Sequence, residues 1–319
     1  MAQYLVTGAA GFIGSNLVRA LLARGEKVRG VDNFSTGKSQ NLDDLKGMDF
    51  LEGDINDAAL MKRACSGVDF VLHEAALPSV PRSVKDPISS NQACLNGTLS
   101  VLMAARDAKV RRVVYAGSSS AYGDTPTLPK HEEMLPRPIS PYAVAKLSGE
   151  LYLQSFWRVY GLETVTLRYF NVFGPFQDPT SFYSGVLAKF ITQMLRGEQP
   201  TIFGDGEQSR DFTYIDNVVN ANLLACIAPT EKVAGGVFNA ATGHRITLNE
   251  TFRVLCDLTE YKGVPAYEPP REGDIKDSLA DISRIRQALA YEPKVDFRDG
   301  LRRTVDWYRT QPAAVAIQA

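Results

Sequence analysis

The sequence predicts an α/β protein with a doubly wound parallel sheet and a smaller, loop-rich C-terminal domain. Three observations carry this prediction. Short apolar runs alternate with helical patterns through the first half of the 319 residues, which is the rhythm of βαβ units. A glycine-rich segment, "TGAAGFIGS", joins the first apolar run to the first helical pattern. From about Gln177 onwards, longer loops rich in glycine and proline replace that rhythm. A Rossmann-type sheet with a loop-rich C-terminal part is therefore expected.

The βαβ rhythm can be followed element by element. The expected strands are the apolar runs at residues 4–8, 27–32, 49–55, 68–76, 111–119 and 163–174. The expected helices are residues 15–25, 90–108 and 141–160. The last of these begins at Pro141, and proline is well suited to the first turn of a helix.

Composition limits the classes of function. Net charge is −1, with 45% hydrophobic and 22% charged residues, so no overall field would recruit nucleic acid or an anionic membrane. The four cysteines and three histidines are scattered, so neither a disulfide framework nor a metal site is expected. No apolar run approaches the roughly 18 residues of a membrane span. The "QYLVTG" strand begins almost at Met1 and leaves no room for a signal peptide. We expect a cytoplasmic protein.

The glycine-rich segment predicts a dinucleotide site. Gly8, Gly11 and Gly14 lie between a strand and a helix, where a tight turn brings backbone N–H groups and the positive end of the helix to a pyrophosphate. Asp32 ends the second strand, where its carboxylate can accept hydrogen bonds from an adenosine ribose. A carboxylate would repel a 2′-phosphate, which favours NAD over NADP. We assign residues 1–176 to an NAD-binding domain and 177–319 mainly to a substrate-binding domain, with the chain crossing back to the first domain.

The stretch "SPYAVAK" places Tyr142 and Lys146 four residues apart. On a helix these side chains lie one turn apart on the same face. They form either a catalytic pair, in which the ammonium group favours the phenolate, or two polar residues on a solvated surface. Spacing alone leaves both interpretations open.

The order of motifs resembles that of the extended short-chain dehydrogenase/reductases over nearly the whole chain. The matching segments are "TGAAGFIGS", "VDN", "GDI", "HEAA", "SSSAYGD", "PYAVAK", "LRYFNVFGP", "SRDFTYIDN" and "REGD". Within that family the chain is similar to nucleotide-sugar 4-epimerases, especially bacterial enzymes that act on UDP-N-acetylhexosamines. The resemblance implies NAD as cofactor, a UDP-sugar as substrate, and interconversion of UDP-GlcNAc and UDP-GalNAc through a 4-keto intermediate, with UDP-Glc and UDP-Gal as further substrates.

The resemblance also implies roles for individual residues. Tyr142 is expected to be the acid or base, Lys146 to lower the pKa of the Tyr142 phenol, and Ser118 to complete the catalytic set. The expected cofactor contacts are Gly8, Gly11, Phe12, Ile13, Gly14, Asp32, Asn33, Ser35, Gly37, Asp54, Ile55, Ala75, Ala76, Tyr142, Lys146 and Tyr169.

The expected substrate contacts divide by the part of the UDP-sugar that they meet. Asn171, Arg210 and Arg271 match diphosphate-binding positions, whose guanidinium groups suit phosphate oxygens. Asp274 is expected at the uridine ribose and Phe203 beside uracil. The residues expected around the sugar are Ser79, Ser119, Gln177 and Ser278. Related enzymes restricted to UDP-glucose carry a tyrosine at the position of Ser278, so the small serine predicts room for an N-acetyl group.

Alternatives and one departure accompany this interpretation. Dehydratases of the family carry an Asp-Glu pair where this chain has Ser119 and Ser120, which disfavours a 4,6-dehydratase; a UDP-glucuronate decarboxylase is the other close alternative. A UDP-glucose 4-epimerase with little N-acetyl preference and a non-catalytic dinucleotide-binding regulator are the remaining ones. Cys94 replaces the asparagine usual in the family, and a thiol is a weak hydrogen-bonding substitute.

The helices at 90–108 and 141–160 carry more apolar residues than one inward stripe requires. The residues that suggest this surplus are Leu99, Leu151, Leu153, Phe156 and Trp157. In resembling enzymes these helices pair with their copies in a four-helix bundle, so a homodimer is expected.

Overall fold

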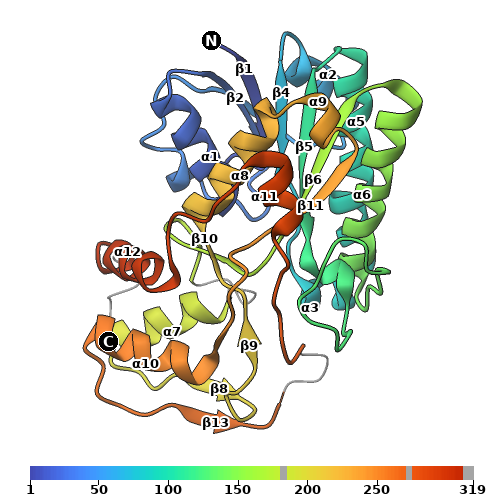
Figure 1. Cartoon of the computed structure of the whole chain (residues 1–319). Coiled ribbons are helices and arrows are strands. Elements are labelled where there is room, and N and C mark those ends of the chain that lie inside the picture. Colours follow the sequence, from blue (N-terminus) through green and yellow to red (C-terminus); the bar gives the residue numbers. More distant parts are fainter. Residues whose placement is uncertain (180–184, 271–274, 312–319) are drawn as a thin grey trace.

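The computed structural model describes residues 1–179, 185–270 and 275–311. Its centre is a seven-stranded parallel sheet in the order β11-β6-β5-β4-β1-β2-β3 (Figure 1). The strands are β1 Gln3–Thr7, β2 Lys27–Asp32, β3 Asp49–Glu52, β4 Phe70–His73, β5 Arg112–Ser118, β6 Glu163–Tyr169 and β11 Gly236–Ala240. The strand order reverses at β1, which lies between β2 and β4. This arrangement confirms the predicted Rossmann-type fold.

Helices cover both faces of the sheet, as Figure 1 shows. One layer contains α2 (Ala58–Cys65), α5 (Gly97–Asp107) and α6 (Pro141–Tyr160). The other contains α1 (Phe12–Ala23), α8 (Ile215–Ile227) and α11 (Ser283–Leu289). Because both faces are covered, the strands other than the edge strand β3 are mostly buried, which explains their continuous apolar runs. None of the described helices is both long and apolar enough to cross a membrane.

Two expected elements differ from the structure. The helix predicted at 90–108 is divided: α4 (Pro87–Asn91) leads into a π-helical segment, Gln92–Asn96, and only then into α5. The strand predicted at 163–174 ends at Tyr169, and a two-residue strand, β7 (Val172–Phe173), follows. The interruption lies at Asn171, whose φ of 35° is incompatible with a strand. Periodicity along the sequence does not reveal such local changes of backbone.

A smaller region lies beside the carboxyl ends of the strands (Figure 1). Its helices are α7 (Val186–Leu195), α10 (Leu248–Thr259) and α12 (Phe297–Arg309). Three short strand pairs complete it: β8 (Thr201–Phe203) with β13 (Ala266–Glu268), β9 (Ser209–Arg210) with β12 (Ile246–Thr247), and β10 (Thr213–Tyr214) with β7. Between Ile215 and Ala240 the chain runs back through α8 and β11 to the main sheet. Residues after 176 therefore contribute to both regions, and a single domain boundary there stays a prediction.

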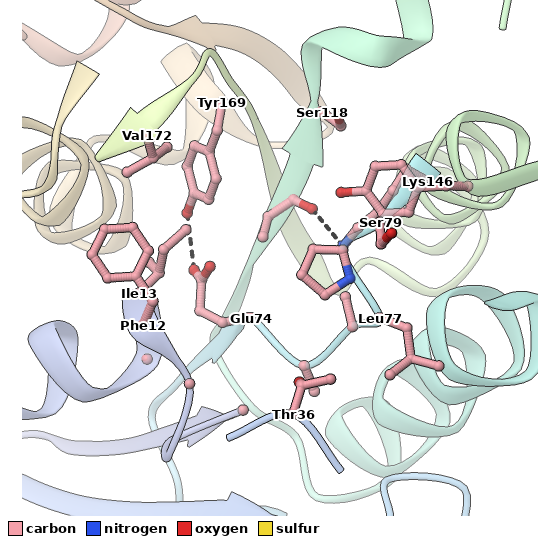
Figure 2. Close-up of a pocket in the computed structure, with 18 of the residues that line it drawn as sticks. Phe12, Ile13, Thr36, Glu74, Leu77, Ser79, Ser118, Lys146, Tyr169 and Val172 are labelled. Carbon is pink, nitrogen blue, oxygen red and sulfur yellow. Dashed lines mark hydrogen bonds between the residues drawn. The ribbon is translucent and has the colours of Figure 1, made fainter. Parts of the chain in front are cut away.

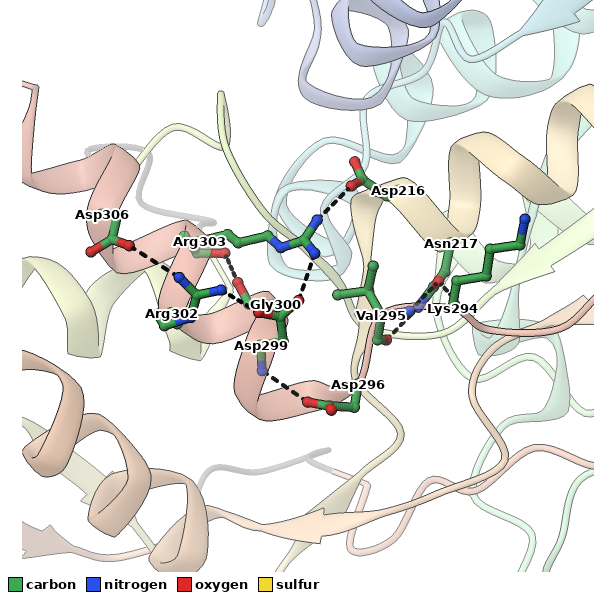
Figure 3. Close-up of polar contacts among 11 residues, drawn as sticks. Asp216, Asn217, Lys294, Val295, Asp296, Asp299, Gly300, Arg302, Arg303 and Asp306 are labelled. Carbon is green, nitrogen blue, oxygen red and sulfur yellow. Dashed lines mark hydrogen bonds and ion pairs between the residues drawn. The ribbon is translucent and has the colours of Figure 1, made fainter.

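Polar contacts tie α12 and the loop before it to α8 (Figure 3). The buried Asn217 side chain donates to Val295 O at 2.8 Å and accepts from the N–H groups of Lys294 and Val295 at 2.8 and 3.1 Å. On the exposed side, Arg303 pairs with Asp299 at 2.6 Å and with Asp216 at 3.3 Å. The Asn217 bonds are shielded from water, so we infer that they contribute more to stability than the exposed ion pairs.

We predict that Asn217→Ala lowers the free energy of unfolding by about 1–3 kcal/mol, because it leaves buried backbone groups of the 294–295 segment without partners. Urea unfolding followed by circular dichroism would measure the loss. Arg303→Ala on the facing helix is the control and should cost clearly less. Equal losses in the two variants would contradict the importance of the buried amide.

Candidate active site

A cavity of about 1150 Å³ opens at the carboxyl ends of the strands (Figure 2). This is the edge at which open α/β sheets bind ligands, beside the point where strand order reverses. The predicted cofactor residues all line it. So do the three predicted catalytic residues and, from the substrate set, Ser79, Ser119, Asn171, Gln177, Arg210 and Ser278. Folding thus brings together side chains from distant parts of the sequence.

The glycine turn at the start of α1 has no space for side chains. A Cβ at Gly14 would lie 2.0 Å from Gly8 O, and one at Gly8 would lie 2.8 Å from Ala75 N. Gly8 also has a φ of +70°, which disfavours other residues. The helix begins at Phe12 after Gly11, which offers no side-chain cap. The first N–H groups of α1 are therefore available to a phosphate.

Asp32 occupies the end of β2 in this cavity. Its carboxylate accepts hydrogen bonds from the N–H groups of Ala10 at 2.9 Å and Phe34 at 2.8 Å. Burial raises the pKa of Asp32, while these backbone bonds act in the opposite direction. The bonds fix a carboxyl group beside the glycine turn, where a ribose hydroxyl of a dinucleotide would meet it. The position of Asp32 is therefore compatible with the predicted contact to the adenosine ribose.

Tyr142 and Lys146 begin α6 as predicted. Ser140 caps the helix by accepting a hydrogen bond from Ala143 N at 3.2 Å, and Pro141 follows it. The buried Lys146 side chain donates from Nζ to Ala116 O at 2.9 Å. Burial lowers the pKa of Lys146, and the nearby Glu74 opposes that effect.

The protein alone does not lower the pKa of Tyr142. Burial raises the pKa of the phenol well above its usual range, and a hydrogen bond with Ser118 only partly offsets this. Lys146 directs its ammonium group to Ala116 O instead. The expectation that Lys146 lowers this pKa together with the positive nicotinamide ring stays a prediction. The positive charge of an oxidised nicotinamide is the further contribution that a phenolate would require.

Ser118 ends β5 and joins a serine pair. Its Oγ lies 2.7 Å from Ser120 Oγ and accepts a hydrogen bond from Ser120 N at 3.2 Å. Together with the bond to Tyr142, these contacts leave Ser118 in the middle of a hydroxyl chain. No role was predicted for Ser120. Its position in the serine triplet at the end of β5 is the sequence feature that could have indicated one.

A buried histidine connects the walls of the cavity. His73 contacts Thr7 Oγ1 through Nδ1 at 2.7 Å and Thr98 Oγ1 through Nε2 at 3.0 Å. Thr98 donates to Cys94 O and Thr7 accepts from Ala75 N, so we assign the ring proton to Nε2. Burial lowers the pKa of His73 to about 3. The ring is thus a neutral link rather than an acid or base.

Cys94 lies in the π-helical segment, which packs against α6. It is buried with Leu77 and Ala145, and Tyr142 packs on this cluster. Its Sγ is 4.0 Å from Leu77 O, which makes a weak polar contact at most. At this position the thiol therefore fills space behind Tyr142.

The predicted substrate residues separate into two places. Arg210 lies in both the main cavity and an adjoining one of about 260 Å³, and Phe203 lies only in the adjoining one. Asn171 and Gln177 also line both. Ser278 is held near Arg210 by its backbone N–H, which donates to Ser209 O at 3.0 Å. Arg271 and Asp274 lie outside the described residues.

Comparisons with known proteins agree with this site. Residues 4–241 match the model of the NAD dependent epimerase/dehydratase family. The UDP-glucose 4-epimerase of Thermotoga maritima, solved with UDP-glucose, is 41% identical with a TM-score of 0.92, over 96% of this chain and 98% of that one. A UDP-N-acetylglucosamine 4-epimerase from Methanobrevibacter ruminantium M1, solved with UDP-N-acetylmuramic acid, gives the same identity and TM-score over 97% and 98%. The UDP-glucose 4-epimerase of Thermus thermophilus, solved with NAD, is 37% identical with a TM-score of 0.87, over 97% and 99%.

The chain therefore belongs to the NAD dependent epimerase/dehydratase family. Its class within the family is that of the NAD-dependent UDP-sugar 4-epimerases. The resemblance found in the sequence and the choice of NAD are confirmed. The glycine turn, free of side chains, fits the cofactor, and Asp32 stands where it would hold the ribose. Within the described parts of the chain, no group of three or more His, Cys, Asp or Glu residues could hold a metal ion.

We predict that Tyr142→Phe lowers turnover by about 10²–10⁴-fold, the usual contribution of a positioned acid or base. The variant should keep its fold and its bound NAD, because the ring remains in place. Conversion of a UDP-sugar to its 4-epimer, separated by chromatography, measures the effect. Tyr152→Phe on the exposed side of the same helix is the control. Turnover near the parent rate in an NAD-loaded Tyr142→Phe protein would contradict the assignment of Tyr142 as the acid or base.

Proposed function

We propose that the protein interconverts UDP-GlcNAc and UDP-GalNAc through a 4-keto sugar, and converts UDP-Glc and UDP-Gal with lower activity. The observation that carries the proposal is that Ser278 and the Ser118–Tyr142 pair line one cavity. The small side chain of Ser278 would leave space beside C2 of the sugar, where the N-acetyl group is attached. The UDP-N-acetylglucosamine 4-epimerase among the similar structures supports the same substrate class.

The residues of this chain would handle the proton of the reaction. Tyr142 takes the proton from the O4′ hydroxyl and later returns it, with Ser118 as hydrogen-bonding neighbour. NAD, held by the glycine turn and Asp32, would supply reversible hydride transfer at C4′ of the sugar, so the overall reaction would be redox neutral. Lys146 is buried, and a positive charge in that position would act more strongly than in water.

Substrate binding would begin at the diphosphate. Arg210 lies where the two cavities meet, and a guanidinium group suits two phosphate oxygens. Asn171 lies on the same border and donates to Asp211 O at 3.3 Å. Phe203 lines the smaller cavity, which would take the uridine. The sugar would then point into the main cavity towards Ser118.

Three alternatives stay distinguishable. A UDP-glucose 4-epimerase with little N-acetyl preference is supported by the Thermotoga structure with UDP-glucose. A dehydratase or decarboxylase is less well supported, since Ser119 and Ser120 offer no carboxylate and Ser120 Oγ is within hydrogen-bond distance of Ser118 Oγ. A non-catalytic regulator would not need Ser118, Tyr142 and Lys146 together. Incubation with UDP-GlcNAc tests these classes: UDP-GalNAc would support an epimerase, a lighter keto product would support a dehydratase, and no conversion of any UDP-sugar would support a regulator.

We predict that Ser278→Tyr lowers turnover of UDP-GlcNAc about tenfold or more while sparing UDP-Gal, since added bulk in a packed site costs about 1–3 kcal/mol. Both substrates should be assayed with the same NAD-loaded preparation. Ser278→Ala is the matched control, because it removes the hydroxyl without closing the pocket. If Ser278→Tyr epimerises UDP-GlcNAc at the parent rate, another residue sets the substrate size.

A homodimer formed through α5 and α6 belongs to the same proposal. Of the five residues that suggested an apolar surplus, Leu153 and Phe156 are in the core, whereas Leu151 is 55% exposed. The other exposed apolar side chains on these helices are Met103, Val144, Tyr152, Val159 and Tyr160. An uncovered face of this kind favours association.

We predict a particle of about twice the 35.0 kDa chain mass by light scattering at micromolar concentration. Leu151→Glu should shift it towards the monomer, because a carboxylate would be buried in the apolar contact. Val264→Glu, at an even more exposed site outside these helices, should have no effect. A parent protein of monomer mass would refute the dimer.

A further inference from the structure

Glu74 places a carboxyl group on the wall of the cavity between the cofactor turn and the catalytic hydroxyls. It directly follows β4, and β4 lies between β1 and β5 in the sheet. β1 leads into the glycine turn, and β5 ends at Ser118. Asp32 marks the adenosine side at the end of β2, beyond β1. By this order across the sheet, Glu74 belongs to the nicotinamide half of the cavity.

The first oxygen of Glu74 is held by a short chain of hydrogen bonds, of which Figure 2 shows the bond from Tyr169. Tyr169 Oη lies 2.9 Å from Glu74 Oε1 and donates to it. Asn222 Nδ2 donates to the same Tyr169 hydroxyl at 2.7 Å. Since the amide supplies a proton to Tyr169, the single phenolic proton is left for Glu74. The carboxyl group is thus fixed in one orientation.

The second oxygen has no such support. Glu74 Oε2 is buried and makes no hydrogen bond with the residues that the structure describes. A buried carboxyl oxygen without a donor is costly unless a ligand supplies a partner. Lys146 is near enough to affect Glu74 electrostatically, yet its Nζ donates to Ala116 O. A cation or donor from the cavity would satisfy this atom.

The surroundings allow Glu74 to carry a negative charge. The titratable groups that face it are Lys146 and Tyr142 from α6 and Tyr169 from β6; the adjacent His73 is neutral. Burial raises the pKa of Glu74 to about 7, against the lowering by Tyr169 and Lys146. An oxidised nicotinamide ring is a cation and a reduced one is neutral, so only the oxidised form would gain from a carboxylate.

We propose that Glu74 Oε2 faces the nicotinamide end of bound NAD and stabilises the oxidised cofactor over the reduced one. Such a preference would oppose accumulation of reduced cofactor between the two hydride transfers. Glu74 would therefore adjust how readily the enzyme takes a hydride, while Ser118 and Tyr142 handle the proton. Tyr169 and Asn222 act as positioning residues for the carboxylate.

The test compares the two forms of the cofactor without any sugar. Protein preloaded with NAD⁺ or with NADH is incubated with equimolar NAD⁺ and NADH until both preparations give the same bound composition. The bound cofactor is then released with methanol and quantified by chromatography. Glu74→Gln keeps the shape and an acceptor for Tyr169 but removes the charge. We expect its bound ratio of NAD⁺ to NADH to fall about tenfold, the order expected when one partly ionised carboxylate near a positive charge is removed at an effective dielectric constant of about 20.

A pH series adds a second readout. Bound NAD⁺ favours the carboxylate and so lowers the pKa of Glu74. The parent ratio of NAD⁺ to NADH should therefore rise with pH up to about 7 and then level off. The Glu74→Gln ratio should be independent of pH over that window. Glu133→Gln, an exposed carboxylate that does not line the cavity, should behave like the parent.

An unchanged ratio in Glu74→Gln, or equal losses of both cofactor forms, would overturn the proposal and leave Glu74 a packing role. Thermal unfolding of each variant shows whether the fold is retained. Because no UDP-sugar is present, a wrong substrate assignment would leave these measurements unaffected.

Discussion

The close approach of backbone to backbone at the glycine turn is the constraint on which the site depends. With hydrogen in place of Cβ at Gly8 and Gly14, α1 starts directly above β1 and the segment after β4 lies against the turn. This contact aims the N-terminus of α1 into the cavity. It also brings Ala75 N within reach of Thr7, from which His73 continues the connection to α5. The glycine turn and the wall that carries the predicted catalytic residues are thereby parts of one packed unit.

Charge in this unit is arranged for two different tasks. The buried Arg168–Glu150 pair, 2.7 Å apart, and the contacts of Arg112 with backbone carbonyls at the end of α8 hold the layers together. In the cavity, by contrast, Lys146 and Glu74 each keep bonding capacity towards the space where ligand binds. The paired charges stabilise the scaffold, and the charged groups that face the cavity are available to a ligand.

The sequence allowed the sheet, the glycine turn and the catalytic set to be predicted, because each depends on local patterns or on a motif. Apolar runs mark strands covered on both faces, and a spacing of four residues places Tyr142 and Lys146 on one helix face. The Glu74–Tyr169–Asn222 chain was not predictable in this way, because its members are 95 and 53 residues apart. The effect of burial on the Tyr142 pKa likewise depends on packing around the ring. The hydrophobic pattern of the sequence around Cys94 does not distinguish the π-helical segment from an ordinary α-helix.

The return of the chain to the sheet through β11 has a consequence for synthesis on the ribosome. β6 ends at Tyr169 and acquires its outer neighbour only when Ala240 has been made, 71 residues later by subtraction. At about 5–20 residues per second, that edge stays unpaired for roughly 4–14 s. An open edge of this kind is a template for intermolecular pairing. The order in which the strands are made therefore sets how long this edge is open to aggregation.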